Sequence, residues 1–174
     1  MVISDKIVWT IGHSTRAMDA FLELLTFYRI EQLVDVRRFP GSKRFPHFKK
    51  ENLESVLPQK GLIYSHLEAL GGRRKASVDS ENTVWRHPSF RGYADYMETL
   101  EFKNTLHALV DMAKKKRCAI MCSEAVWWRC HRSMIADQLK AQGWKVYHII
   151  DGHTPTEHPY TKPAQLKNGQ LTYH

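Results

Sequence analysis

The side chains best suited to chemistry are gathered in one short segment, residues 122–132, which reads CSEAVWWRCHR. The segment holds thiols, a carboxylate, an imidazole and a guanidinium, on Cys122, Glu124, Cys130, His131 and Arg132. A thiolate acts as a nucleophile or metal ligand, and a carboxylate or an imidazole moves protons. A guanidinium holds an oxyanion through two parallel N–H donors. We therefore predict that the functional site is built around this segment.

The segment begins where an apolar run ends and finishes where a helical pattern begins. Residues 117–122 (RCAIMC) are almost wholly apolar, as expected for a central parallel strand that is buried on both faces. Residues 134–142 have the spacing of a helix. A strand-to-helix turn presents free backbone N–H groups and the positive end of the helix dipole, which favour anions. A cysteine placed there beside Arg129, His131 or Arg132 shifts toward its thiolate.

Three other interpretations of this segment remain open. In a structural one, Glu124 pairs with Arg132 and the thiols are small buried apolar side chains. In a metal-binding one, the four ligands are Cys122, Cys130, His131 and one of His13 and His153. No CxxC or HExxH spacing supports a metal. In a redox one, Cys122 and Cys130 are oxidised together and reduced again.

Further candidates follow the other predicted strands. In a parallel sheet the carboxyl ends of the strands meet at one edge, and ligands bind outside that edge. This rule places the residues that follow the other predicted strands at the same edge as Cys122 and Glu124. These residues are His13, Asp35, Arg37, Asp151 and His153. His13 is either a ligand contact or a satisfied hydrogen-bonding residue. Asp35 most simply pairs with a nearby arginine.

Positive charge is concentrated in the loop of residues 37–50, which has six Lys or Arg and no acidic residue. With Gly71, Gly72 and Arg73, this loop is a candidate anion-binding rim. The formal net charge of +8 favours anionic partners such as a nucleotide, a phosphorylated metabolite or nucleic acid. The simpler interpretation is a solvated basic surface. Aromatic residues around Trp85 and Phe90 can stack on a base, or they can belong to the core.

Strand and helix patterns alternate along the chain, which predicts an α/β fold with a parallel sheet and helices on both faces. About five strands are expected, at residues 6–11, 32–36, 62–66, 117–122 and 144–150. Helices are expected at residues 19–28, 51–57, 93–116 with a break near 102, and 134–142. We predict a single domain over residues 1–174, with a core of about residues 6–150 and a tail, residues 151–174, packed on it.

Nothing in the sequence indicates export or membrane insertion. No stretch approaches the roughly 18 to 20 apolar residues that a membrane helix needs. Three cysteines within one short stretch argue against a disulfide framework. We expect a cytoplasmic protein with reduced thiols.

Several motifs resemble an uncharacterised bacterial and archaeal family catalogued as domain of unknown function 488. The motifs are TIGHST at residues 10–15, DVRRFPGS at 35–42, LGGRR at 70–74, FRGYADYM at 90–97 and MCSEAVWWRCHR at 121–132. Residues 158–173 also resemble the tail of one subgroup. The family usually has Cys-Ala-Glu where this chain has Cys122, Ser123 and Glu124. The resemblance implies a family identity and supplies no reaction.

The leading hypothesis from these patterns is an enzyme that acts on an anionic, nucleotide-like or nucleic-acid-derived ligand. Its reactive candidates are Cys122, Glu124, Cys130 and His131, and its anion clamps are Arg37, Arg73 and Arg132. The alternatives are a non-catalytic module that binds nucleic acid or a protein, and a redox or metal-binding protein. The sequence does not determine a cofactor, an oligomeric state or a pathway.

Overall fold

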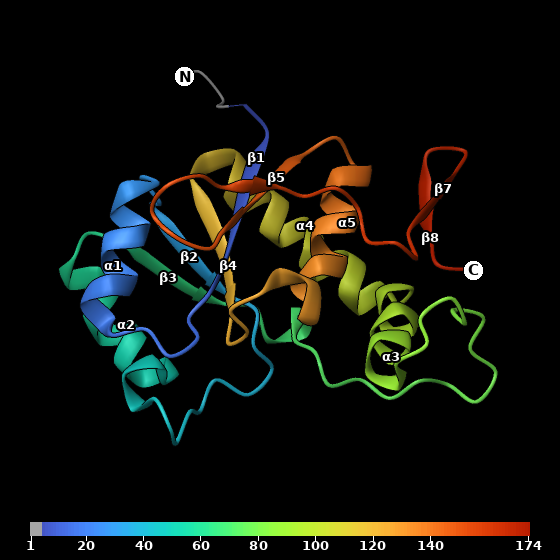
Figure 1. The fold of residues 1–174 in the computed structure, drawn as a ribbon, viewed down its shortest axis with the longest axis horizontal. Helices are drawn as coiled ribbons and strands as arrows, with labels where there is room; N and C mark the ends of the chain where they lie inside the picture. The colour runs from blue at the N-terminus through green and yellow to red at the C-terminus, as the bar shows by residue number, and fades with distance from the viewer. Residues whose placement is uncertain (1–4) are drawn as a thin grey trace.

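The computed structural model describes residues 5–174 and has one central sheet of six strands in the order β3-β2-β4-β1-β5-β6 (Figure 1). These strands are β1 (Ile7–Gly12), β2 (Gln32–Asp35), β3 (Ile63–His66), β4 (Cys118–Cys122), β5 (Lys145–Ile149) and β6 (Thr156–Glu157). The first five run parallel, and β6 pairs antiparallel with β5. The predicted α/β fold with a mainly parallel sheet is therefore confirmed.

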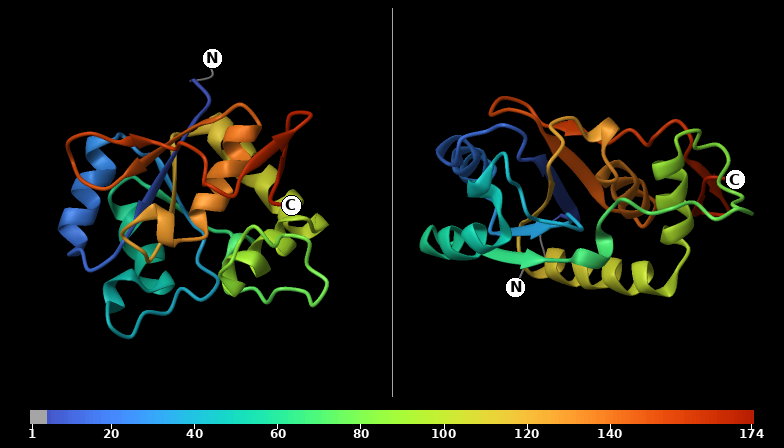
Figure 2. Two further views of the ribbon diagram at one scale, coloured as in Figure 1. Left: turned by 45° about the vertical axis from the view of Figure 1, so that its right-hand side comes forward. Right: turned by 90° about the horizontal axis from the view of Figure 1, so that it is seen from below.

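Helices cover both faces of this sheet, as predicted. They are α1 (Met18–Phe27), α2 (Lys50–Gln59), α3 (Pro88–Met97), α4 (Leu100–Lys115) and α5 (Arg132–Ala141). Buried side chains of α1 and α2 belong to one apolar core, and those of α3, α4 and α5 to a second core. Figure 2 shows the helices around the sheet from two further sides.

Strand β4 lies between the two cores, and its side chains divide between them. Cys118 and Cys122 pack in the core shared with α3, α4 and α5, whereas Ala119 and Met121 pack in the core shared with α1 and α2. The division follows from the alternation of side chains on a strand, which point to opposite faces in turn. Cys122 is consequently directed toward the face that α5 covers.

The helical region predicted at residues 93–116, with a break near 102, consists of two helices, and its start and its break lie a few residues earlier than predicted. Helix α3 already begins at Pro88, a residue favoured in the first turn of a helix. Helix α4 then starts after Thr99, whose Oγ1 accepts a hydrogen bond from the backbone N–H of Phe102 at 3.2 Å. The break falls at this N-cap, a few residues before the position near 102 that the sequence indicated.

The C-terminal tail has more regular structure than its polar, proline-containing sequence indicated. It supplies the edge strand β6 and an antiparallel hairpin of β7 (Gln165–Lys167) and β8 (Gln170–Thr172). Within residues 5–174, no helix combines the length and the apolarity that crossing a lipid bilayer requires.

Candidate functional site

A cavity of about 650 Å³ opens beyond the carboxyl ends of β1, β2 and β4. Its walls come from the loops after these strands and from residues 72–73 and 89–90. The loops after β2 and β4 lie together at the lower side of Figure 1. This is the edge at which open parallel sheets bind their ligands, and the volume is that of a small-molecule site.

The cavity wall is strongly basic. Five arginines and one carboxylate line it: Arg37, Arg38, Arg44, Arg73, Arg129 and Glu124. The Glu124 side chain belongs to an exposed residue, so its carboxylate is open to solvent and to a ligand. Positive charge around a hollow attracts and retains anions.

Most of the residues singled out from the sequence line this cavity, and some do not. Those that line it are His13, Arg37, Gly72, Arg73, Cys122, Glu124, Cys130 and His131. Asp35, Gly71 and Arg132 lie buried behind its wall. Asp151 and His153, which follow β5, are exposed residues away from the lining.

Two glycines allow the walls of the cavity to approach one another. A Cβ at Gly12 would lie 1.6 Å from the carbonyl oxygen of Glu124, so any side chain there would displace the loop after β4. A Cβ at Gly72 would lie 3.0 Å from Nδ1 of His131. The absence of a side chain at Gly12 therefore makes room for the loop after β4.

Arg132 is fully buried and holds the loop after β4 in place. Its Nη1 donates to the carbonyl oxygen of Glu124 at 2.7 Å and to Sγ of Cys122 at 3.0 Å. Its Nη2 donates to the carbonyl oxygen of Ala125 at 3.1 Å. These bonds go to backbone and sulfur, and none goes to the Glu124 carboxylate, as a structural lock would require. The guanidinium therefore positions the cavity wall and places a positive charge beside the thiols.

Cys122 and Cys130 lie next to this guanidinium, and their two thiols influence each other's pKa. Sγ of Cys130 accepts from the backbone N–H of Arg132 at 3.5 Å. Burial raises the pKa of Cys122 well above its ordinary value. Burial also acts to raise the pKa of Cys130, but the hydrogen bond from Cys122 and the charge of Arg132 outweigh it and lower that pKa. Of the two thiols, Cys130 is the one that ionises more readily.

His131 presents one ring nitrogen to Cys130. Its Nε2–H donates to the carbonyl oxygen of Val36 at 2.9 Å, which leaves Nδ1 as the acceptor, 3.7 Å from Sγ of Cys130. Burial lowers the pKa of His131, so the imidazole is neutral near pH 7. A neutral Nδ1 beside a thiol can take up its proton.

His13 serves as a fixed hydrogen-bond acceptor in the cavity wall. Its Nδ1–H donates to the carbonyl oxygen of Ser14 at 2.9 Å, and its Nε2 accepts from Nη1 of Arg37 at 3.3 Å. The ring stacks on Phe48, with ring centroids 4.4 Å apart. Burial lowers its pKa to about 4, so this imidazole stays neutral near pH 7.

Asp35 and Arg37 form a bidentate ion pair, in agreement with the prediction that Asp35 pairs with a nearby arginine. Arg37 Nε lies 2.9 Å from Oδ1 of Asp35, and Nη2 lies 2.7 Å from Oδ2. Tyr64 donates its hydroxyl to the same carboxylate at 2.6 Å. Nη2 also donates to the carbonyl oxygen of Phe48 at 2.8 Å, so the guanidinium is held rigidly in the cavity wall.

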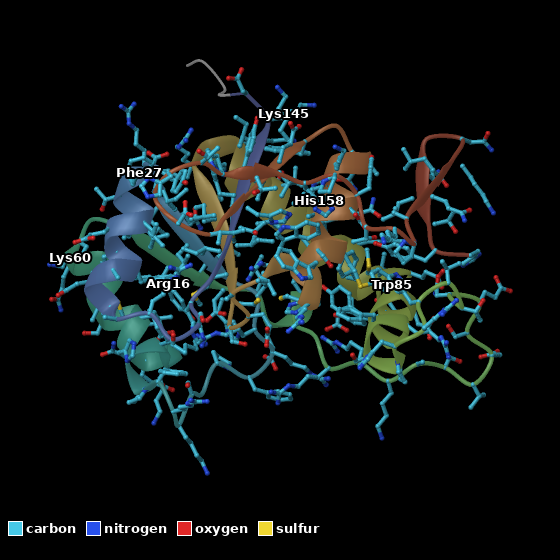
Figure 3. The ribbon with its side chains drawn as sticks, in the orientation of Figure 1. Arg16, Phe27, Lys60, Trp85, Lys145 and His158 are labelled. Atoms are coloured by element: carbon cyan, nitrogen blue, oxygen red, sulfur yellow. The ribbon has the colours of Figure 1, made fainter. Side chains whose placement is uncertain are left out.

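A buried polar chain that no sequence pattern indicated joins the tail to the sheet. The hydroxyl of Thr10 bonds Nδ1 of His148 at 2.6 Å, and Nε2 of His148 bonds Nδ1 of His158 at 2.9 Å. His158 then donates from Nε2 to the carboxylate of Asp137 at 2.7 Å. His158, labelled in Figure 3, comes from the segment after β6. No sequence spacing connects these residues, because they meet only after folding.

This chain also reaches the loop of the cavity. Trp127 stacks on the ring of His148, with centroids 4.5 Å apart and an interplanar angle of 6°. The loop after β4 is therefore held from one side by Arg132 and from the other by the polar chain of the tail. Across residues 5–174, no group of three or more His, Cys, Asp or Glu side chains is arranged to hold a metal ion.

The fold and the cavity together define a class of protein: a parallel α/β domain with an arginine-lined hollow at the carboxyl edge of its sheet. The chain belongs to the family described as Domain of unknown function DUF488, which matches residues 17–139. This match confirms the resemblance that the motifs indicated. No curated protein matches the chain, and no solved structure matches it.

Proposed function

We propose that the protein is an enzyme that acts on an anionic, nucleotide-like ligand in this cavity. The observation that supports the proposal best is the composition of the cavity wall, in which five arginines and one carboxylate accompany two thiols and two imidazoles. Charge in this proportion favours a ligand with phosphate groups. A thiol, an imidazole and an open carboxylate in the same wall supply groups for covalent and acid–base chemistry.

Each lining residue has a role in this proposal. Cys130 is the nucleophile, because its pKa is lowered and the residue, although buried, lines the cavity. Glu124 moves a proton to or from the ligand, since its carboxylate is open to the cavity. Arg37 and Arg73 contact the anionic group. Arg132, a predicted anion clamp, has a positioning role instead, because it does not line the cavity and its Nη1 and Nη2 donate to Cys122 and to the loop after β4.

The test uses a panel of nucleoside 5′-mono-, di- and triphosphates, with binding measured by calorimetry and products identified by mass spectrometry. We expect the protein to convert at least one of them. Glu124→Gln and Cys130→Ser should each lower the rate by a factor of about 100 or more. Glu124 is exposed, and Cys130→Ser exchanges only sulfur for oxygen at a buried position, so we expect both variants to fold.

Matched controls are available for both variants. Glu23 is an exposed glutamate on α1, and Cys118 is a buried thiol that lies outside the cavity lining. Glu23→Gln and Cys118→Ser should keep the activity of the unaltered protein. Failure of every nucleotide to bind at millimolar concentration would refute the proposal. Full activity in Glu124→Gln and Cys130→Ser would refute the assigned roles.

A further inference from the structure

We propose that the ligand is a single-stranded nucleic acid, with Phe39 and Trp128 as stacking platforms for its bases. This inference rests on the proposed function, since it names the substrate class of the same cavity. It is carried by two features of the surface: exposed aromatic rings on two of the loops that build the cavity, and positive charge that continues beyond the cavity wall.

The aromatic rings stand out by their exposure. In the described part of the chain, three phenylalanine or tryptophan side chains are more than half exposed: Phe27 at 60%, Phe39 at 59% and Trp128 at 53%. Phe39 lies in the loop after β2, and Trp128 lies in the loop after β4, between the lining residues Ala125 and Arg129. Two of the three rings thus belong to loops that form the cavity.

The surroundings of Phe39 suit a ligand that has both an aromatic base and a negatively charged phosphate. The guanidinium groups of Arg38 and Arg73 lie 5.3 Å and 5.8 Å from the centre of its ring. Arg38 also donates to the carbonyl oxygen of Arg73 at 2.9 Å, which ties the two sides of this rim together. A base that stacks on Phe39 would bring its phosphate to these arginines.

The positive surface is larger than the cavity. Lys43 and Lys49 in the loop after β2 are exposed, and they lie outside the lining to which Arg44 belongs. Trp128 also lies outside the lining. A mononucleotide in the cavity would leave these side chains unused, whereas a longer strand would contact them. The extent of the surface therefore favours an oligonucleotide over a free nucleotide.

The rings favour a single strand over a duplex. Bases in a duplex are stacked on one another, so an aromatic side chain cannot stack on them without opening the helix. Proteins that bind single strands combine a basic groove with aromatic rings, and each stacked base contributes about 1–3 kcal/mol. The loops of this cavity have both components.

The experiment measures the binding of a short fluorescein-labelled oligothymidylate by anisotropy at low salt. Phe39→Ala and Trp128→Ala should each raise the Kd by about fivefold or more. Phe27→Ala is the matched control, because Phe27 is equally exposed and lies on α1, away from the loops of the cavity (Figure 3). It should leave the Kd unchanged. All three side chains are exposed, so the variants should fold.

Charge is tested separately from stacking. Kd should rise with salt because phosphate contacts release counterions, and Arg44→Ala should reduce the log–log slope by about 0.7. Inorganic polyphosphate, which has charge without bases, should compete weakly for the protein. A duplex of the same sequence should bind more weakly than the single strand.

Three results would overturn the inference. Equal binding of polyphosphate and oligothymidylate would leave an anion site without base recognition. Full affinity of Phe39→Ala and Trp128→Ala would remove the stacking platforms. Binding of mononucleotides without oligothymidylate would refute the single strand and leave the proposed function intact, whereas loss of both would refute the two proposals together.

Discussion

Two polar clusters in this molecule use similar side chains and differ in what those side chains face. In the buried chain of Thr10, His148, His158 and Asp137, each side chain bonds the next, and none of the four keeps an unpaired buried polar atom in the described structure. At the cavity, by contrast, Glu124 and the outer arginines end at an open hollow. Because the side chains of the first cluster bond one another, we assign it a structural role. Because those of the second cluster end at the open cavity, we expect them to contact a ligand.

The closed cluster fastens the tail to the domain. The carboxylate of Asp137 accepts from the backbone N–H and the hydroxyl of Thr161, and from the hydroxyl of Tyr173. All of these partners belong to the segment after β6. Buried hydrogen bonds to a charged group are strong when every partner is present and costly when one is missing.

The largest predicted effect breaks this closed cluster. Asp137→Ala should lower the free energy of unfolding by about 3–5 kcal/mol, because it leaves several buried donors without an acceptor. Urea denaturation measures the loss. Asp111→Ala is the control, since its side chain on α4 is about half exposed, and it should change stability by less than about 0.5 kcal/mol. Equal stability of the two variants would show that the closed cluster does not hold the tail.

The next prediction compares two thiols. Cys130 lines the cavity and has a lowered pKa, whereas burial raises the pKa of Cys118 to about 12. Iodoacetamide at pH 7 should therefore modify Cys130 at least about tenfold faster than Cys118 in the folded protein. Peptide mass spectrometry after short exposure gives both rates. Faster modification of Cys118 would contradict the proposed site.

Acid should destabilise the protein through its neutral histidines. The pKa of His13 is about 4 when folded, against about 6.5 when unfolded. As the pH falls from 6.5 to 4, the unfolded state binds a proton at this imidazole and the folded state does not. The free energy of unfolding is therefore retained above pH 6.5 and declines toward pH 4. Each such histidine adds about 1.4 kcal/mol per pH unit to this loss of unfolding free energy.

A variant isolates the share of His13 in this decline. His13→Gln should show a smaller loss of unfolding free energy between pH 6.5 and 4.5 than the unaltered protein, measured by urea denaturation at both pH values. His107 is an exposed histidine on α4, so His107→Gln should retain the full decline. An unchanged decline in His13→Gln would mean that folding does not lower the pKa of this imidazole.

The smallest effect concerns an outer arginine. Arg129 is exposed and lines the cavity, and Arg129→Ala should raise the Kd of 5′-AMP about fivefold with little change in stability. Lys60 lies at the end of α2 far from the cavity (Figure 3), and Lys60→Ala should leave that Kd unchanged. Equal effects of the two variants would indicate general attraction by net charge rather than a site.

Much of the fold could be predicted because apolar periodicity is a local signal. The five parallel strands lie within a few residues of their predicted positions, and so do α1, α2 and α5. The pattern indicated a break near residue 102 but not its position at Thr99, since α3 and α4 continue the same apolar spacing on either side of that residue. Strand β6 has two residues and depends on pairing with β5, which no local pattern reveals.

For the site, the sequence could identify positions better than roles. The rule that strand ends meet at one edge predicted which segments come together, and residues from the ends of β1, β2 and β4 do line one cavity. The burial of Arg132 and its bonds to backbone could not be foreseen, because an arginine beside reactive groups looks the same whether it faces a ligand or the interior. The partners of Asp137 are far away in sequence, which hid the closed cluster.

A crystal structure of the protein with 5′-AMP tests the assignment of the cavity most directly. We expect electron density for the nucleotide beyond the ends of β1, β2 and β4, with its phosphate at Arg37 or Arg73 and close to Cys130. A nucleotide bound elsewhere on the molecule, or an empty cavity at saturating nucleotide, would contradict the proposal.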